Sequence, residues 1–203
     1  LTIEPGKYHF LKGINMRETR LFNDNWKFIK IEPGTTGYEN SDSWVNVDIP
    51  HDWLIYDTNN LYEDSEGWYR KTFDMQTETG VRYALRFDGV YMEPVVYVNG
   101  AKAGEWKYGY NTFEIDITDY LVNGANEIRV QVMHRSPNSR WYSGAGIFRN
   151  IWFKTMPDTH FVSDGIYIRT ERTDAGYMLK VSSEISGSEF DAVAYTVFDM
   201  NGT

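Results

Sequence analysis

The stretch VRYALRFDG, residues 81–89, decides the fold class. Apolar side chains recur at every second position of this stretch, at Val81, Tyr83, Leu85 and Phe87. Neighbouring side chains of a strand point to opposite faces of the sheet. A period of two therefore predicts a strand with one face in a core.

The same period extends outward along the chain. GWYRKTFDM (67–75), IFRNIWFKT (147–155) and NEIRVQVMH (126–134) are predicted strands, and Phe148 and Trp152 are expected on one buried face. YNTFEIDITDYL (110–121) predicts a strand and a short helical turn capped by Thr118. EPVVYVNG (93–100) ends in Asn-Gly, a strong hairpin signal. Because no segment shows three turns of helical periodicity, we predict an all-β sandwich.

A domain boundary is predicted near Met156-Pro157-Asp158, where a segment rich in Trp and Gly gives way to a plainer one. We expect a first domain over residues 1–157, with an N-terminal arm over about residues 1–20. Beyond the boundary, strands are predicted at 165–170, 177–185 and 191–198, and Asn201-Gly202 is again a turn signal. We expect residues 158–203 to be the first part of a second β-sandwich; the alternative is a self-contained three-stranded extension.

Charge and composition restrict the partners. The chain carries 20 Lys and Arg against 29 Asp and Glu, a net charge of -9, and its field repels nucleic acid and anionic lipid. A neutral or cationic partner fits this charge better. No apolar run approaches the ~20 residues of a membrane span, and we expect no signal peptide in this chain, because its first residues lack a basic segment followed by an apolar one. There is no Cys, which leaves the compartment open between the cytoplasm and the bacterial periplasm or exterior.

No catalytic constellation is visible. The four histidines are His9, His51, His134 and His160, and none has the spacing of a metal ligand pair. His51 and Asp52 invite comparison with a Ser-His-Asp triad, but no nucleophile motif accompanies them, so a structured turn with Trp53 packed inward is the preferred interpretation. We assign no catalytic residue, no metal and no cofactor.

Two segments suit carbohydrate. Aromatic rings stack on the apolar C–H faces of sugars, while Arg, Asn and Asp side chains bond to pairs of hydroxyl groups. Such side chains gather in SRWY (139–142) and in DTNNLYEDSEGW (57–68). The candidate sugar-binding residues are Arg140, Trp141, Tyr142, Asn60 and Asp64. The alternative is that these aromatic residues belong to an ordinary core.

Five segments in register carry a family resemblance: WVNVDIPHDW, EGWYRKTF, RFDGVYMEPVVYVNG, NTFEIDITDYLVNGANEIRVQV and SRWYSGAGIFRNIWF. Over about residues 20–157 they resemble the N-terminal sugar-binding domain of glycoside hydrolase family 2, which includes β-galactosidases, β-glucuronidases and β-mannosidases. The tail resembles the start of the immunoglobulin-like domain that follows it. The resemblance implies a jelly-roll sandwich and then the first part of an immunoglobulin-like sandwich.

The resemblance also implies a role for residues 139–150. In this family the corresponding loop runs toward the active-site mouth of a separate (β/α)₈ barrel, which carries both catalytic glutamates. Gly144 to Gly146 would let the backbone pass closely, and Arg140–Tyr142 would face the sugar or the barrel. The segment is most similar to the β-galactosidase branch, since glucuronidase-like relatives tend to have an acidic residue at the position of Arg140.

The expected function is that of a non-catalytic fragment. The parent enzyme would hydrolyse terminal β-galactosides with retention, and this chain would shape the pocket and support the barrel, its main protein partner. A homo-oligomer of the full-length protein is left open. The alternatives are a stand-alone carbohydrate-binding module, a structural scaffold between domains, or a β-glucuronidase or β-mannosidase parent.

Overall fold

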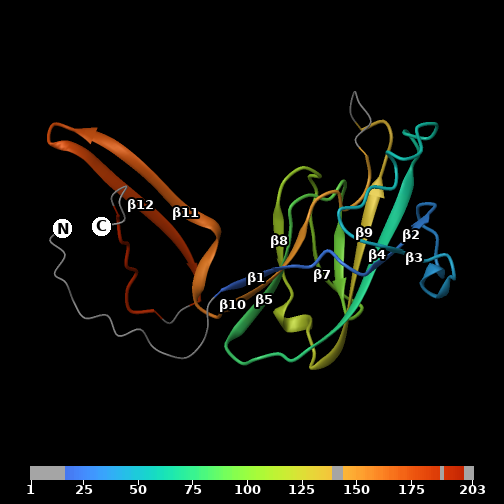
Figure 1. Cartoon of the computed structure of the whole chain (residues 1–203), viewed down its shortest axis with the longest axis horizontal. Helices are drawn as coiled ribbons and strands as arrows, with labels where there is room; N and C mark the ends of the chain where they lie inside the picture. Colours follow the sequence, from blue (N-terminus) through green and yellow to red (C-terminus); the bar gives the residue numbers. More distant parts are fainter. Residues whose placement is uncertain (1–16, 139–143, 188–189, 199–203) are drawn as a thin grey trace. The chain divides into compact units, whose positions relative to one another are not determined.

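A computed structural model describes residues 17–138, 144–187 and 190–198 and divides the chain into two compact units. The larger unit spans Asn15–Thr155, and the smaller includes Met156–Thr203. The described residues form strands and two short 3₁₀ turns, η1 (Tyr38–Asn40) and η2 (Thr118–Tyr120), with no α-helix among them (Figure 1). The predicted all-β fold is confirmed.

The larger unit is a sandwich of two sheets. The four-stranded sheet has the order β1 (Glu18–Leu21), β10 (Ile151–Pro157), β5 (Val81–Phe87) and β8 (Phe113–Asp116). The six-stranded sheet has the order β3 (Val45–Val47), β2 (Trp26–Ile31), β4 (Ser65–Met75), β9 (Gly124–His134), β6 (Val95–Val98) and β7 (Ala101–Glu105). Strands distant in sequence are therefore neighbours, so the core depends on long-range pairing.

The core lies between these sheets and is formed by the side chains at every second position of the strands. Tyr83, Leu85 and Phe87 of β5 are buried, and alternate residues of β9, Ile128, Val130 and Val132, enter the same cluster from the other sheet. Burying each such side chain contributes roughly 1.5–3 kcal/mol relative to exposure. The predicted inward faces of both strands are confirmed.

The predicted Asn-Gly hairpin is also confirmed. Asn99 and Gly100 have φ of 50° and 84°, as a two-residue type I′ turn requires, and they join β6 to β7. The Asn99 side chain extends the turn by donating to the Tyr120 carbonyl oxygen at 2.8 Å and by accepting from the Glu127 N–H at 2.9 Å.

Two local predictions in this unit are wrong. Residues 147–155 do not form one strand, because β10 begins only at Ile151. A bend at Arg149 and Asn150 breaks the alternation, so Phe148 and Trp152 are half-buried while Ile147, Ile151 and Phe153 fill the core.

Thr118 does not cap η2. Its hydroxyl accepts the Tyr83 N–H at 2.8 Å, and the Asp116 carboxylate instead accepts the Thr118 N–H at 2.9 Å. Asp116 and Thr118 lie two residues apart and both can accept an N–H group at this turn, and the sequence alone does not show which of them does so.

The smaller unit contains a long hairpin. Strand β11 (His160–Thr173) pairs antiparallel with β12 (Gly176–Ser186). The expected strand at 191–198 is not one: this segment packs near the base of the hairpin and the Tyr195 hydroxyl bonds to that of Ser183 at 2.5 Å, without joining the sheet. The turn expected at 201–202 lies outside the described residues. That this region begins an immunoglobulin-like domain stays a prediction.

Candidate functional site: the paired loops

Two loops meet at the end of the sandwich where β4 begins and β9 ends. We call them the paired loops: residues 52–64, and the described residues 136–138 and 144–145. They are joined at both ends: the Asp52 carboxylate accepts the Ala145 N–H at 3.1 Å, and the Asp64 carboxylate accepts the Ser136 N–H at 2.6 Å. Strand register places Ser65 opposite His134 immediately beneath them. The two loops are thus tied together, although the residues joined lie 93 and 72 positions apart in the chain.

Asp52 organises the first joint. Besides Ala145, its Oδ1 accepts the N–H groups of Leu54 at 2.8 Å and Ile55 at 3.1 Å. Backbone bonds surround this carboxylate, from His51 N to Ile147 O at 2.8 Å and from Trp53 N to Ala145 O at 2.9 Å. A carboxylate that accepts three N–H groups fixes the start of one loop and the return of the other at a single point.

Glycine is required at this joint. Gly144 and Gly146 have φ of 72° and 138°, where side chains are rarely tolerated. A Cβ on Gly144 would overlap the Asp52 carboxylate, and one on Gly146 would overlap the His51 carbonyl oxygen. Residues 144–146 have almost no side chains because this turn passes directly against His51 and Asp52.

His51 does not pair with Asp52. Its Nδ1 lies 2.8 Å from the hydroxyl of Tyr69, which is fully buried on β4 and also accepts the Ile147 N–H at 3.4 Å. Burial lowers the pKa of His51 below its usual value, against an opposing effect of the Asp52 charge. Burial likewise raises the pKa of Tyr69 well above its usual range.

His51 and Tyr69 therefore form a neutral pair that supports the joint. The structured-turn interpretation of residues 50–53 is confirmed: Trp53 is partly buried, stacks on Phe28 with ring centroids 5.4 Å apart, and donates to the Ser65 hydroxyl at 3.0 Å.

The second joint is acidic and more exposed. Besides the Asp64–Ser136 bond, Glu63 pairs with Lys30 at 2.8 Å, and the His134 ring nitrogen Nδ1 lies 2.5 Å from the Glu63 carbonyl oxygen. The Asn60 amide donates to the Glu63 carboxylate. Both Asn60 and Asp64 are exposed on the loop surface, and Asp64 also holds the loop.

Aromatic side chains continue the surface from the Gly turn. Tyr91 exchanges two backbone bonds of 2.9 Å with Gly146. Its ring contacts that of Tyr110 at 5.1 Å between centroids, and Tyr110 contacts Phe148 at 6.1 Å. Tyr108 and Tyr110 are exposed, so this aromatic ridge offers apolar faces beside the joint.

The candidate residues divide into two groups. Arg140, Trp141 and Tyr142 lie outside the described residues, and their role stays a prediction. Asn60 and Asp64 lie on the loop formed by residues 52–64, which is bonded to Ser136 and Ala145 on either side of residues 139–143. Sequence reasoning missed Asp52 as an organiser, although an acidic residue just before a turn is a known acceptor for the next N–H groups.

Among the residues that the structure describes, no three His, Asp or Glu side chains gather as a metal site would require. No helix in the described ranges is long and apolar enough to cross a membrane.

Comparison with known proteins agrees on one family. Residues 25–157 match the family model described as glycosyl hydrolases family 2, sugar binding domain. The chain is 36% identical over 177 residues to the beta-galactosidase BoGH2A of Bacteroides ovatus, covering 79% of this chain and 21% of the relative. It is 33% identical over 191 residues to a putative beta-glucuronidase of Formosa agariphila, covering 87% of this chain and 18% of the relative.

Solved structures agree. A beta-glycosidase from Bacteroides vulgatus superposes with a TM-score of 0.71 at 30% identity, over 85% of this chain and 24% of that structure. The chain thus spans about a fifth of the length of the curated relatives it matches. The matched domain, the sandwich and the resemblance of five sequence segments lead to one conclusion: the chain belongs to glycoside hydrolase family 2 and contains its sugar-binding domain.

Proposed function

We propose that this chain forms one wall of the active site of a β-galactosidase-like enzyme that retains anomeric configuration. The observation that supports this most is the double joint of the paired loops, because it fixes Ser136 and Ala145, the residues on either side of the segment 139–143. Binding residues act best when rigid neighbours hold them. In this proposal Arg140–Tyr142, with Asn60 and Asp64, contact the sugar, and a separate barrel domain of the parent supplies the two carboxyl groups of a retaining mechanism.

The substrate is the second part of the proposal. A β-galactoside is favoured because the beta-galactosidase BoGH2A is a similar relative and the SRWY segment resembles that branch. A β-glucuronide is the second candidate, since several similar relatives are named beta-glucuronidases. Chromogenic β-galactoside and β-glucuronide, offered separately to the full-length parent, distinguish them by kcat/KM.

The wall role is tested in the full-length parent with three variants. Arg140→Ala should lower kcat/KM by about tenfold, the effect of losing a charged hydrogen bond in the transition state. Asp52→Ala should lower kcat/KM as well, because it releases the joint. Asp57→Ala is the matched control: it removes the same charge from the same loop, and among the described residues the Asp57 carboxylate accepts a local N–H from Asn59 and forms no bond to the second loop.

The outcomes separate the alternatives. Unchanged kcat/KM for both Arg140→Ala and Asp52→Ala, with normal melting temperatures, would contradict the wall role and favour a scaffold between domains. Clear binding of neutral galactosides by the 203-residue chain alone would favour a stand-alone carbohydrate-binding module.

A further inference from the structure

The segment that joins β7 to β8, residues 106–112, carries an exposed surface made of aromatic side chains. Trp106, Tyr108 and Tyr110 are 39%, 58% and 44% exposed. Tyr108 and Tyr110 belong to the aromatic ridge, and we call this ridge and Trp106 together the aromatic surface. Within the described part of the chain, neither of these two tyrosine hydroxyl groups is engaged in a hydrogen bond. Ring faces and hydroxyl groups are therefore both open to a ligand.

Trp106 is held against the core by a column of stacked rings. Its ring is nearly parallel to that of Phe113, with 8° between the planes and 5.7 Å between the centroids, and Phe113 stacks on Phe87 at 4.9 Å. Phe113 and Phe87 are buried. Because one face of the Trp106 indole covers Phe113, the opposite face is the one left to solvent, and its orientation is fixed by the column beneath it.

Close packing of the backbone fixes the two tyrosines. A Cβ on Gly109 would overlap the ring of Tyr91, so the chain crosses this buried ring with no room for a side chain. The Tyr110 ring contacts that of Tyr91, with 5.1 Å between the centroids, and the Tyr108 ring contacts that of Tyr110 at 5.8 Å and an angle of 64°. The two exposed tyrosine rings thus form a corner instead of a flat plate.

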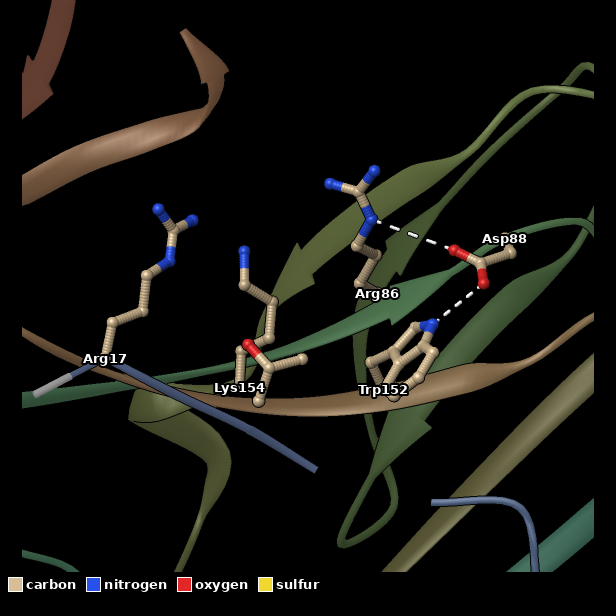
Figure 2. A pocket seen from close by; sticks show the side chains of 6 residues that line it. Arg17, Arg86, Asp88, Trp152 and Lys154 are labelled. Carbon is tan, nitrogen blue, oxygen red and sulfur yellow. Dashed lines mark hydrogen bonds and ion pairs between the residues drawn. The ribbon is translucent and has the colours of Figure 1, made fainter. Parts of the chain in front are cut away.

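Asp88 fixes the far end of the aromatic ridge. Its Oδ2 accepts the indole N–H of Trp152 at 2.8 Å, and Figure 2 shows how this bond ties the residues after β5 to β10. The next residue, Gly89, lies against the Phe148 ring, which a Cβ at this position would overlap. Phe148 in turn contacts Tyr110, with 6.1 Å between the ring centroids. The exposed rings are therefore supported from both sides, and rigid neighbours favour binding because less order is lost on association.

The aromatic surface is continuous with the paired loops. Tyr91, whose ring supports Tyr110, exchanges two backbone hydrogen bonds of 2.9 Å with Gly146. Gly146 directly follows Ala145, the residue that Asp52 holds in the first joint. The rings therefore begin where the return of the second loop ends.

The make-up of the aromatic surface favours a neutral saccharide. Aromatic rings stack on the apolar C–H faces of sugars, and tyrosine hydroxyl groups both donate to and accept from sugar hydroxyl groups. The exposed aliphatic side chains that a protein interface would also use lie elsewhere in the sandwich, at Leu21, Val45 and Val122. The charged residue of the segment is Lys107, and its ammonium group lies 3.9 Å from the Glu105 carboxylate.

We infer that the aromatic surface binds the neutral sugar units that follow the terminal residue of an oligosaccharide substrate. This inference rests on the proposed function: when a terminal galactose occupies the wall formed by the paired loops, every further unit belongs to the leaving group. The open face of Trp106 stacks on one unit, and Tyr108 and Tyr110 contact a neighbouring unit from two sides. The corner between the tyrosine rings suits a single soluble chain better than a flat crystalline polysaccharide.

The test compares two substrates of the full-length parent, methyl β-galactoside and a β-linked galactotetraose, through the galactose released at early times. Tyr108→Ala and Trp106→Ala should each lower kcat/KM for the tetraose by about fivefold, the effect of one lost aromatic contact. The methyl group is too small to reach the rings, so kcat/KM for methyl β-galactoside should stay within about twofold. Tyr108→Phe keeps the ring and should retain most of the activity on the tetraose.

Tyr167→Ala is the matched control, because it removes a tyrosine of similar exposure, 65%, from the β11–β12 hairpin. Trp106→Ala removes one ring from a stacked column, so melting temperatures are measured for every variant. If Trp106→Ala does not fold, Tyr108→Ala still decides the matter, since Tyr108 is the more exposed of the two residues.

Several results would overturn the inference. Equal losses on both substrates with a lower melting temperature would show that another part of the parent packs on these rings. Losses on the tetraose no greater than in Tyr167→Ala would exclude the rings from binding. Arg140→Ala separates this inference from the proposed function: if it lowers kcat/KM on both substrates while the ring variants do not differ from the control, the wall role stands and the aromatic surface is refuted. Unchanged kcat/KM in Arg140→Ala beside selective losses in the ring variants would support the aromatic surface and contradict the wall role.

Discussion

The sandwich and the β11–β12 hairpin are both built from paired antiparallel strands, but they bury very different amounts of apolar surface. In the sandwich, Leu85, Phe87 and Val130 are fully buried. In the hairpin, Tyr167, Ile168 and Tyr177 are 65%, 60% and 78% exposed, and no described residue beyond Met156 is buried. The net contribution of a hydrogen bond is small, whereas apolar burial is the main favourable term in folding. Regular pairing alone therefore does not make a region stable.

The largest expected difference between the two regions is in amide hydrogen exchange. Amides of β5 should exchange only on global unfolding, which requires about 5–15 kcal/mol in ordinary domains. Amides of β12 should exchange through local opening at a much lower free energy, because little apolar surface is exposed when the hairpin opens. Equal protection in Tyr177–Ile185 and Val81–Phe87 would contradict the comparison.

A pair of truncations gives the next largest effect. Phe153→Ala should cost about 3–5 kcal/mol of unfolding free energy, because the ring is buried among other aromatic side chains and a cavity would remain. Ile168→Ala in the hairpin should change stability by no more than about 0.5 kcal/mol, since the residue is exposed. Urea unfolding followed by circular dichroism measures both. A large loss in Ile168→Ala would reveal a core around the hairpin.

Turn glycines give a smaller contrast. Gly100 and Gly176 both have positive φ, 84° and 131°, with no atom near an added Cβ. Gly100→Ala should lower sandwich stability by about 1 kcal/mol through backbone strain alone. Gly176→Ala should leave the main unfolding midpoint unchanged and only speed exchange in β12. Matching shifts in the main midpoint would mean that the two units unfold together.

The smallest expected effect is a dependence on pH. Because burial lowers the pKa of His51 in the folded state, the unfolded chain binds more protons below the usual His pKa of about 6.5. The contribution of this group is fully present above that pH and is lost as the pH falls through the folded-state pKa. Thermal melts of the wild type and His51→Gln across this range should converge at acid pH if the assignment is correct.

The sequence predicted the parts of the fold that depend on local pattern. Alternation identified the inward residues of β5 and β9, and the Asn99-Gly100 turn followed from the dihedral angles that those residues tolerate. The predictions that failed concern residues whose conformation is set by contacts with residues far away in the sequence. The outward direction of Trp152 follows from the alternation of side chains only if β10 starts at Ile151. The bend before Ile151 is held by bonds from Asn23 and Asp88 to Asn150, and no local sequence pattern reveals these contacts.

The same reason explains the other misses. Residues 191–198 have the composition of a strand, but a strand requires a neighbour with which to pair, and none is supplied to them in the described part of the chain. In the candidate site, the sequence placed Asn60 and Asp64 on a polar loop. It could not show that Asp52 bonds to Ala145, 93 positions away.

The double joint of the paired loops has a consequence for how this end of the sandwich can change in sequence. Both anchoring carboxylates, Asp52 and Asp64, and both of their N–H partners lie outside residues 139–143. Substitutions at residues 139–143 therefore leave both anchoring carboxylates in place. Because loops are the parts of a fold in which sequence change is tolerated best, we expect the sequence between the two joints to vary more freely among related chains than Asp52 and Asp64 do.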